Sequence, residues 1–72
     1  MSRLIAFRSR SEAMRLSRAL SARRIANTVI NTPRSLGVSC GLSVVFSPSS
    51  TDTVRNIVTE LNLQTQQGIF QK

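Results

Sequence analysis

The sequence predicts an α+β fold in which two helices cover one face of a four-stranded antiparallel sheet. Segments with strand-like and helical hydrophobic periodicity follow one another in the order β-α-β-β-α-β. The chain has 72 residues, enough for one domain, which we expect to span residues 1–72. Two interleaved β-α-β halves of this kind form the ferredoxin-like arrangement.

In the first half, an apolar run over residues 4–7 predicts a buried strand. Ser9 and Glu12 then form the Ser-x-x-Glu pattern of a capping box, which predicts a helix that runs to about Ala22. A β-branched run within residues 25–32 predicts the second strand.

In the second half, proline, glycine and serine are frequent over residues 33–41 and predict a loop. Alternating apolar and polar residues over 42–46 predict a third strand with one buried face. Ser49 is the expected N-cap of a second helix, which should end near Asn62. A short final strand is expected around residues 68–70.

The residue content excludes most enzyme mechanisms. One cysteine, three carboxylates and no histidine leave no Cys–His or Ser–His pair and no ordinary zinc site. We therefore expect a carrier, a binding module or a subunit rather than a self-sufficient enzyme, with no cofactor and no metal. A domain of this size buries only about 60% of its unfolded surface, so a homodimer is one route to further stability.

Positive charge is concentrated in the first third of the chain. The formal net charge is +7, and residues 1–24 alone carry +6. Arg15 and Arg18 fall on the helix face opposite the apolar stripe. There they could bind a partner, either an acidic protein or RNA. The other interpretation is a solvated face that keeps a small protein soluble.

No stretch of the sequence reaches the roughly 18 apolar residues of a membrane span, so no membrane partner is expected. Residues 1–24 are rich in arginine and serine and poor in acids, as transit peptides are. The same segment supplies the first strand and helix, however. We therefore expect it to remain part of the domain, and we expect the protein to be cytoplasmic.

The nine residues from Pro33 to Gly41 are the predicted functional site. This loop is longer than a hairpin requires, and long loops are often functional. Gly37 and Gly41 permit backbone conformations or close approaches that other residues resist. Cys40 is the only thiol in the chain, and Gly41 beside it has no side chain that would shield the sulfur.

The chemistry expected of this loop is that of a thiolate. Nearby cations and hydrogen-bond donors favour the thiolate over the thiol, and Arg34 and Ser39 can supply the two kinds of group. Without a second cysteine, Cys40 cannot close an internal disulfide, but it can carry a sulfur atom as a persulfide. The alternative is that Cys40 is a small buried hydrophobic residue.

Several short motifs follow one another along the chain. They are Phe7 and Ser9 after the first strand, Ala13 and Leu20 in the helix, Pro33-Arg34, Ser39-Cys40-Gly41-Leu42, Phe46, and Gly68-Ile69-Phe70. In this order they resemble a bacterial domain family of unknown function described as putative Se/S carrier protein-like. The resemblance implies that Cys40 carries sulfur or selenium, that a cysteine-desulfurase-type enzyme is the donor, and that Arg34 and Gly41 belong to the site. It leaves the acceptor unknown.

Three hypotheses therefore stay open. The leading one is a small sulfur or selenium carrier whose cargo is bound to Cys40. The second is a basic RNA- or nucleic-acid-binding module. Ferredoxin-like sheets can stack RNA bases on aromatic residues, although Phe46 is expected in the core, and the arginines could bind the nucleic-acid backbone. The third is a structural or regulatory subunit without chemistry of its own, which predicts a shielded Cys40.

Overall fold

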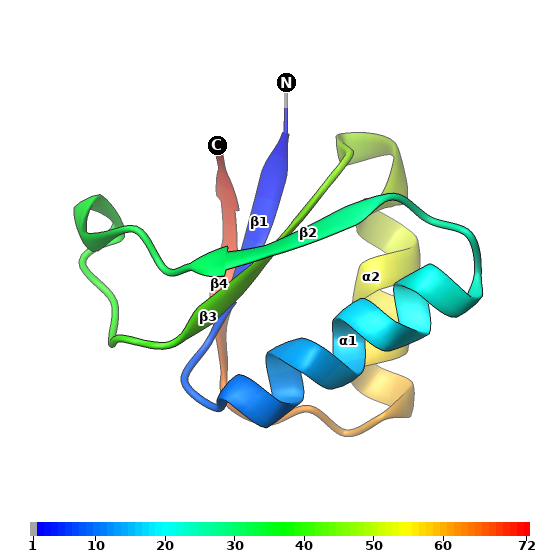
Figure 1. The fold of residues 1–72 in the computed structure, drawn as a ribbon, viewed down its shortest axis with the longest axis horizontal. Coiled ribbons are helices and arrows are strands. Elements are labelled where there is room, and N and C mark those ends of the chain that lie inside the picture. The colour runs from blue at the N-terminus through cyan, green and yellow to red at the C-terminus, as the bar shows by residue number, and fades with distance from the viewer. Residues whose placement is uncertain (1) are drawn as a thin grey trace.

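The computed structural model describes residues 2–72. Its helices and strands follow the predicted order, and two one-turn 3-10 helices (η1 and η2) lie in the loops (Figure 1). The elements are β1 (Arg3–Phe7), α1 (Arg10–Ala22), β2 (Asn27–Asn31), η1 (Arg34–Leu36), β3 (Leu42–Phe46), η2 (Pro48–Ser50), α2 (Thr51–Glu60) and β4 (Gln66–Gln71). The sheet order is β2-β3-β1-β4 with all neighbours antiparallel, which confirms the predicted ferredoxin-like fold.

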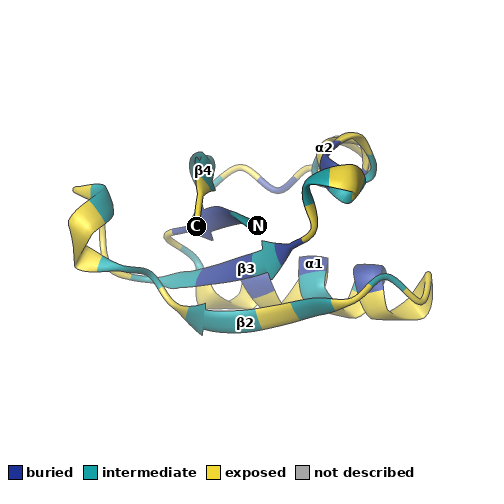
Figure 2. Ribbon diagram, turned by 90° about the horizontal axis from the view of Figure 1, so that it is seen from above, coloured by how far each residue is buried: buried dark blue, intermediate teal, exposed yellow. Residues whose placement is uncertain are grey.

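The hydrophobic core lies between the helices and one face of the sheet. Ile5 and Phe7 of β1 and Val44 and Phe46 of β3 alternate toward this core, and none of them is more than 2% exposed. The helices contribute Ala13, Leu16, Leu20, Val54 and Ile57. Figure 2 shows that the buried residues follow β1, β3 and the inner sides of both helices.

The sheet face without helices is also partly closed. Leu4 and Ala6 are buried there, and so is Ser43, which lies outside the face of β3 that was predicted to be buried. Alternation alone misjudges Ser43 because β1 and β3 are the two central strands of the sheet. Side chains of the strands on either side therefore cover the side chains of β1 and β3, even on the face without helices. The Ser43 and Thr32 hydroxyls lie 2.8 Å apart, and their hydrogen bond satisfies the buried group.

The first turn of α1 ties this helix to the last strand. Ser9 is the N-cap as predicted and accepts from the Glu12 N–H at 3.2 Å. The Glu12 carboxylate does not complete a capping box. Instead it accepts from the Thr65 N–H at 2.8 Å, the Thr65 hydroxyl at 2.7 Å and the Gln64 N–H at 3.3 Å. Burial alone would raise the pKa of Glu12, but these hydrogen bonds and the charge of Arg15 hold it below its ordinary value.

The start of α2 differs from its prediction. Ser50, not Ser49, occupies the N-cap position, and its side chain makes no capping hydrogen bond. The chain enters α2 through η2, where the Thr51 hydroxyl donates to the Pro48 carbonyl at 2.7 Å. Within residues 2–72, neither helix is long and apolar enough to cross a membrane.

Candidate functional site

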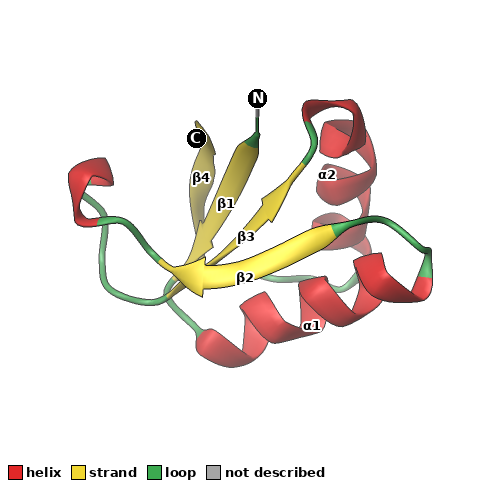
Figure 3. Ribbon diagram, turned by 45° about the horizontal axis from the view of Figure 1, so that its top comes forward, coloured by secondary structure: helices red, strands yellow, loops and turns green. Residues whose placement is uncertain are grey.

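The β2–β3 loop extends beyond the end of the sheet, on the side away from α2 (Figures 1 and 3). Its base is closed by the Thr32 N–H, which donates to the Gly41 carbonyl at 3.1 Å. Two parts of this loop are held in different ways. We call residues 34–37 the outer turn and residues 39–41 the inner segment.

The outer turn is held by local hydrogen bonds. Pro33 precedes η1, the Leu36 N–H donates to the Pro33 carbonyl at 3.2 Å, and the Gly37 N–H donates to the Arg34 carbonyl at 3.1 Å. Gly37 has φ +69°, a left-handed conformation that favours glycine, and a Cβ there would have no neighbour within 4 Å. Arg34 is exposed, and its guanidinium makes no hydrogen bond within the described residues.

The inner segment is held by a residue from β4. The Gln67 side chain accepts from the Ser39 N–H at 3.1 Å and donates to the Ser39 carbonyl at 3.2 Å. A side-chain amide carries both a donor and an acceptor, so Gln67 binds both backbone polar groups of Ser39. The contact joins two residues that are 28 positions apart in the sequence.

Gly41 is held by close packing against the end of β1. A Cβ at this position would overlap the carbonyl oxygen of Phe7 and would lie 3.2 Å from the Cα of Arg8. These are backbone atoms, which cannot move aside as a flexible side chain can. Glycine at position 41 is therefore required by the space available, while at position 37 it is favoured by the backbone conformation.

Cys40 lies between these two anchored residues and is exposed to solvent. The alternative of a buried hydrophobic cysteine is therefore wrong. Ser39 is held to Gln67 through its backbone N–H and its backbone carbonyl. No hydrogen bond reaches the Cys40 sulfur within residues 2–72. The arginine whose backbone lies against the inner segment is Arg8. Arg34, which the sequence indicated, lies in the outer turn instead.

Sequence reasoning missed two residues of this site, Arg8 and Gln67. Arg8 follows β1, and antiparallel pairing brings that end of β1 beside the start of β3, so the sheet topology alone could have indicated it. The Arg8 N–H also donates to the Thr65 carbonyl at 3.0 Å, which brings the start of β4 to the same place. Gln67 had no comparable signal, because it stands among several polar residues just before the predicted strand.

The other predicted partner-binding residues lie outside this loop. Arg15 and Arg18 are exposed on α1. Phe7 and Phe46 are buried in the core and cannot stack on RNA bases, which leaves the half-buried Phe70 of β4. The described residues contain no group of three cysteine or acidic side chains that could hold a metal ion.

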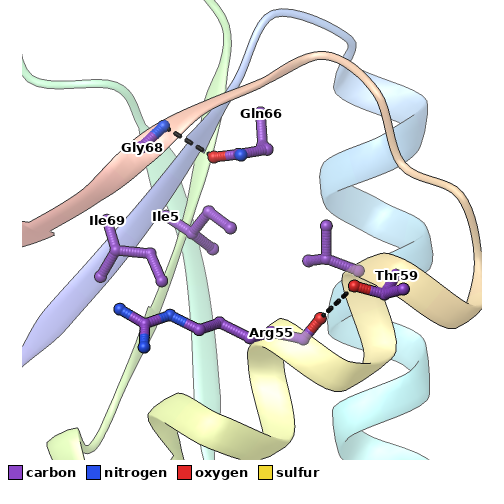
Figure 4. Close-up of a pocket in the computed structure, with 7 residues that line it drawn as sticks. Ile5, Arg55, Thr59, Gln66, Gly68 and Ile69 are labelled. Atoms are coloured by element: carbon purple, nitrogen blue, oxygen red, sulfur yellow. Dashed lines mark hydrogen bonds between the residues drawn. The ribbon is translucent and has the colours of Figure 1, made fainter.

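A separate cavity of about 450 Å³ opens between α2 and β4 (Figure 4). Apolar side chains of Ile5, Val58 and Ile69 line it, and the Arg55 side chain extends along one side. Cys40 and the rest of its loop do not line this cavity. Cys40 is therefore exposed on its loop and lies outside this cavity.

Comparison with known proteins identifies one relationship. No curated protein and no solved structure matches the chain. A family model described as "Putative Se/S carrier protein-like" matches residues 2–69, a range that includes the entire β2–β3 loop. The description names a carrier role rather than a catalytic one. The chain belongs to this family of selenium and sulfur carrier-like proteins, as the motifs around Cys40 indicated.

Proposed function

We propose that this protein carries a sulfur or selenium atom covalently bound to the Sγ atom of Cys40. One observation carries the proposal: the only thiol of the chain is exposed between two residues that are fixed to the folded domain. A carrier must present its thiol to one partner after another. An exposed sulfur on an anchored loop meets that requirement, and the family relationship agrees with it.

For sulfur, the step is a transfer between thiols. The Cys40 thiolate attacks the terminal sulfur of a persulfide on a cysteine-desulfurase-type donor. A bond forms between that sulfur and Cys40 Sγ, the sulfur–sulfur bond of the donor breaks, and the donor leaves as a thiolate. No net oxidation or reduction occurs. An acceptor thiolate or another nucleophile would remove the terminal sulfur by the same kind of attack.

The surrounding residues would assist this exchange in different ways. Arg34 lies in the outer turn, and the backbone of Arg8 lies against Gly41, so a donor that approaches the loop would meet both of these positively charged residues. Gly41 leaves one side of the sulfur uncovered. The outer turn, with Gly37 at its end, would meet the surface of the donor first.

The test is the intact mass of the protein after incubation with a cysteine desulfurase and free cysteine, before and after treatment with a reductant. We expect a gain of one sulfur atom that the reductant removes, and no gain in the Cys40→Ser variant. Retention of the gain in Cys40→Ser would contradict the proposal, as would failure of the unmodified protein to gain sulfur from any persulfide.

A relocated thiol supplies the matched control. Ser49 is exposed in η2, which follows the opposite end of β3. The double variant Cys40→Ser with Ser49→Cys therefore keeps one exposed thiol but removes it from the loop. We expect this variant to accept sulfur from the desulfurase much more slowly than the unmodified protein. Equal rates would mean that any exposed thiol suffices and that the loop has no special role.

A further inference from the structure

We infer that the outer face of α1 is the docking surface for the sulfur donor, and that the donor presents an acidic surface with an apolar patch. The inference rests on the proposed carrier function. The surface consists of Arg10, Met14 and Arg18 in one row, with Arg15 beside it and Arg8 at the end nearest Cys40. We call this set the α1 row.

Within residues 2–72, no arginine of the α1 row forms an ion pair. Residues 2–72 form a single ion pair, between Arg23 and Glu60 at 3.5 Å, and neither residue belongs to the row. The charge of Arg15 acts on Glu12, but the Glu12 carboxylate accepts its hydrogen bonds from Thr65 and Gln64 and forms no ion pair with an arginine. Unpaired guanidinium groups on one helix face attract an acidic partner and increase its rate of association.

Met14 gives this surface an apolar centre. It is 38% exposed and is the only large hydrophobic residue exposed to this extent within the described chain. Arg10 and Arg18 lie four residues before and after it, so one arginine flanks it on each side along the helix. An apolar residue ringed by charged residues is typical of a protein interface, and methionine adapts readily to the shape of a partner.

The α1 row begins beside the proposed carrier site. Arg8 packs against Gly41, and α1 starts two residues later. Figure 1 and Figure 3 both show the returning end of the β2–β3 loop next to the start of α1. From Arg10 to Arg18 the row extends about 12 Å along the helix. A protein bound to it would therefore also contact the loop that holds Cys40.

A protein fits this surface better than RNA does. Single-stranded RNA is usually bound by aromatic side chains on which its bases stack. Here Phe7 and Phe46 are buried, and the α1 row contains no aromatic residue. Its one apolar residue, Met14, matches an apolar side chain on a protein surface.

The experiment compares sulfur transfer to Cys40 from two kinds of donor, a panel of cysteine desulfurases and a small neutral organic persulfide. In the double variant Arg10→Gln with Arg18→Gln, we expect the rate from the enzyme to fall by about tenfold or more at low salt. The difference should shrink at high salt, because exposed charges are then screened. Met14→Ser should slow the enzyme by several-fold at all salt concentrations. The small persulfide, which needs no docking surface, should react equally with every variant.

A charge-matched control is the double variant Arg55→Gln with Lys72→Gln, which removes two positive charges outside the α1 row. It should retain most of the enzyme-dependent rate, and an equal loss there would overturn the inference in favour of a general charge effect. Reaction of the protein with the small persulfide but with no desulfurase would overturn the docking inference alone. Failure with both donors would overturn the carrier function itself.

Binding of a single-stranded RNA is the competing outcome. If such an RNA binds at moderate salt and the double variant Arg10→Gln with Arg18→Gln abolishes this binding while enzyme-dependent transfer is unchanged, the surface is assigned to RNA instead.

Discussion

The outer turn and the inner segment belong to the same loop, yet they are stabilised in opposite ways. The outer turn, residues 34–37, is closed by hydrogen bonds between residues three positions apart. The inner segment, residues 39–41, is fixed by Gln67 from β4 and by the backbone of Phe7 and Arg8. The difference shows that the tip of the loop depends on its own residues, whereas the segment that contains the thiol is fixed to the rest of the domain.

The largest effect should come from Gly41→Ala. The added methyl group would overlap the Phe7 carbonyl, so either β1 or the start of β3 must shift. We expect the free energy of unfolding to fall by about 3 kcal/mol or more, a large part of the stability of so small a domain. Urea denaturation followed by circular dichroism measures this loss. A loss below about 1 kcal/mol would mean that the inner segment is not packed as tightly as the structure shows.

Gly37→Ala is the matched substitution in the outer turn. Here the methyl group meets no atom within 4 Å, and the cost arises only from the left-handed backbone. We expect a loss of about 1 kcal/mol in the same denaturation experiment. If Gly37→Ala proved as destabilising as Gly41→Ala, the distinction between a locally held tip and an anchored thiol would fail.

Gln67→Met tests the hydrogen bonds of the inner segment without a large change in side-chain volume. Both bonds to Ser39 are lost, but they lie at the surface, so we expect the free energy of unfolding to fall by only about 0.5–1 kcal/mol. The informative measurement is amide hydrogen exchange, in which the Ser39 N–H should lose its protection while Gly37 is unaffected. Unchanged protection at Ser39 would contradict the anchoring role of Gln67.

The smallest expected effect is on the pH dependence of stability, through Glu12, whose carboxylate binds Gln64 and Thr65 just before β4. The pKa of Glu12 is lower in the folded protein than its ordinary value of 4.5. Its ionised form therefore stabilises the fold above about pH 4.5, and this contribution is lost as the pH falls through the folded-state pKa. We expect Glu12→Gln to be less sensitive to acid than the unmodified protein over this range. The measurement is thermal unfolding of both proteins between about pH 3 and pH 6, a range set by the ordinary pKa values of carboxyl groups. A steeper acid dependence in the variant would contradict the lowered pKa of Glu12.

The elements of the fold were predictable because each has a local signal. The apolar run of β1, the Ser9 cap and the strand-like pattern of β3 depend on neighbouring residues, and the structure confirms these elements, although Ser43 of β3 is buried on the face that alternation left exposed. Glu12 shows where local reasoning fails. Its spacing from Ser9 is that of a capping box, but hydrogen bonds from Thr65, 53 positions away, take its carboxylate instead.

The site was only partly predictable for the same reason. Cys40 was indicated as the only thiol of the chain, and Gly41 as the glycine beside it in a long loop; the family relationship strengthens that interpretation. Gln67 and Arg8 join the inner segment only through the pairing of β4 and β3 with β1. No pattern within the loop contains that information, because both contacts arise when distant segments of the sheet come together.

The position of β4 at the edge of the sheet has a consequence for the order in which the structure opens. β4 pairs only with β1, whereas the β2–β3 hairpin is closed by its own ladder and by the bond between Thr32 and Gly41. Edge strands commonly separate in partial unfolding events that leave the rest of a domain intact. Such an event would release Ser39 from Gln67 while the hairpin persists, so Cys40 could reach further outward at a free-energy cost below that of global unfolding.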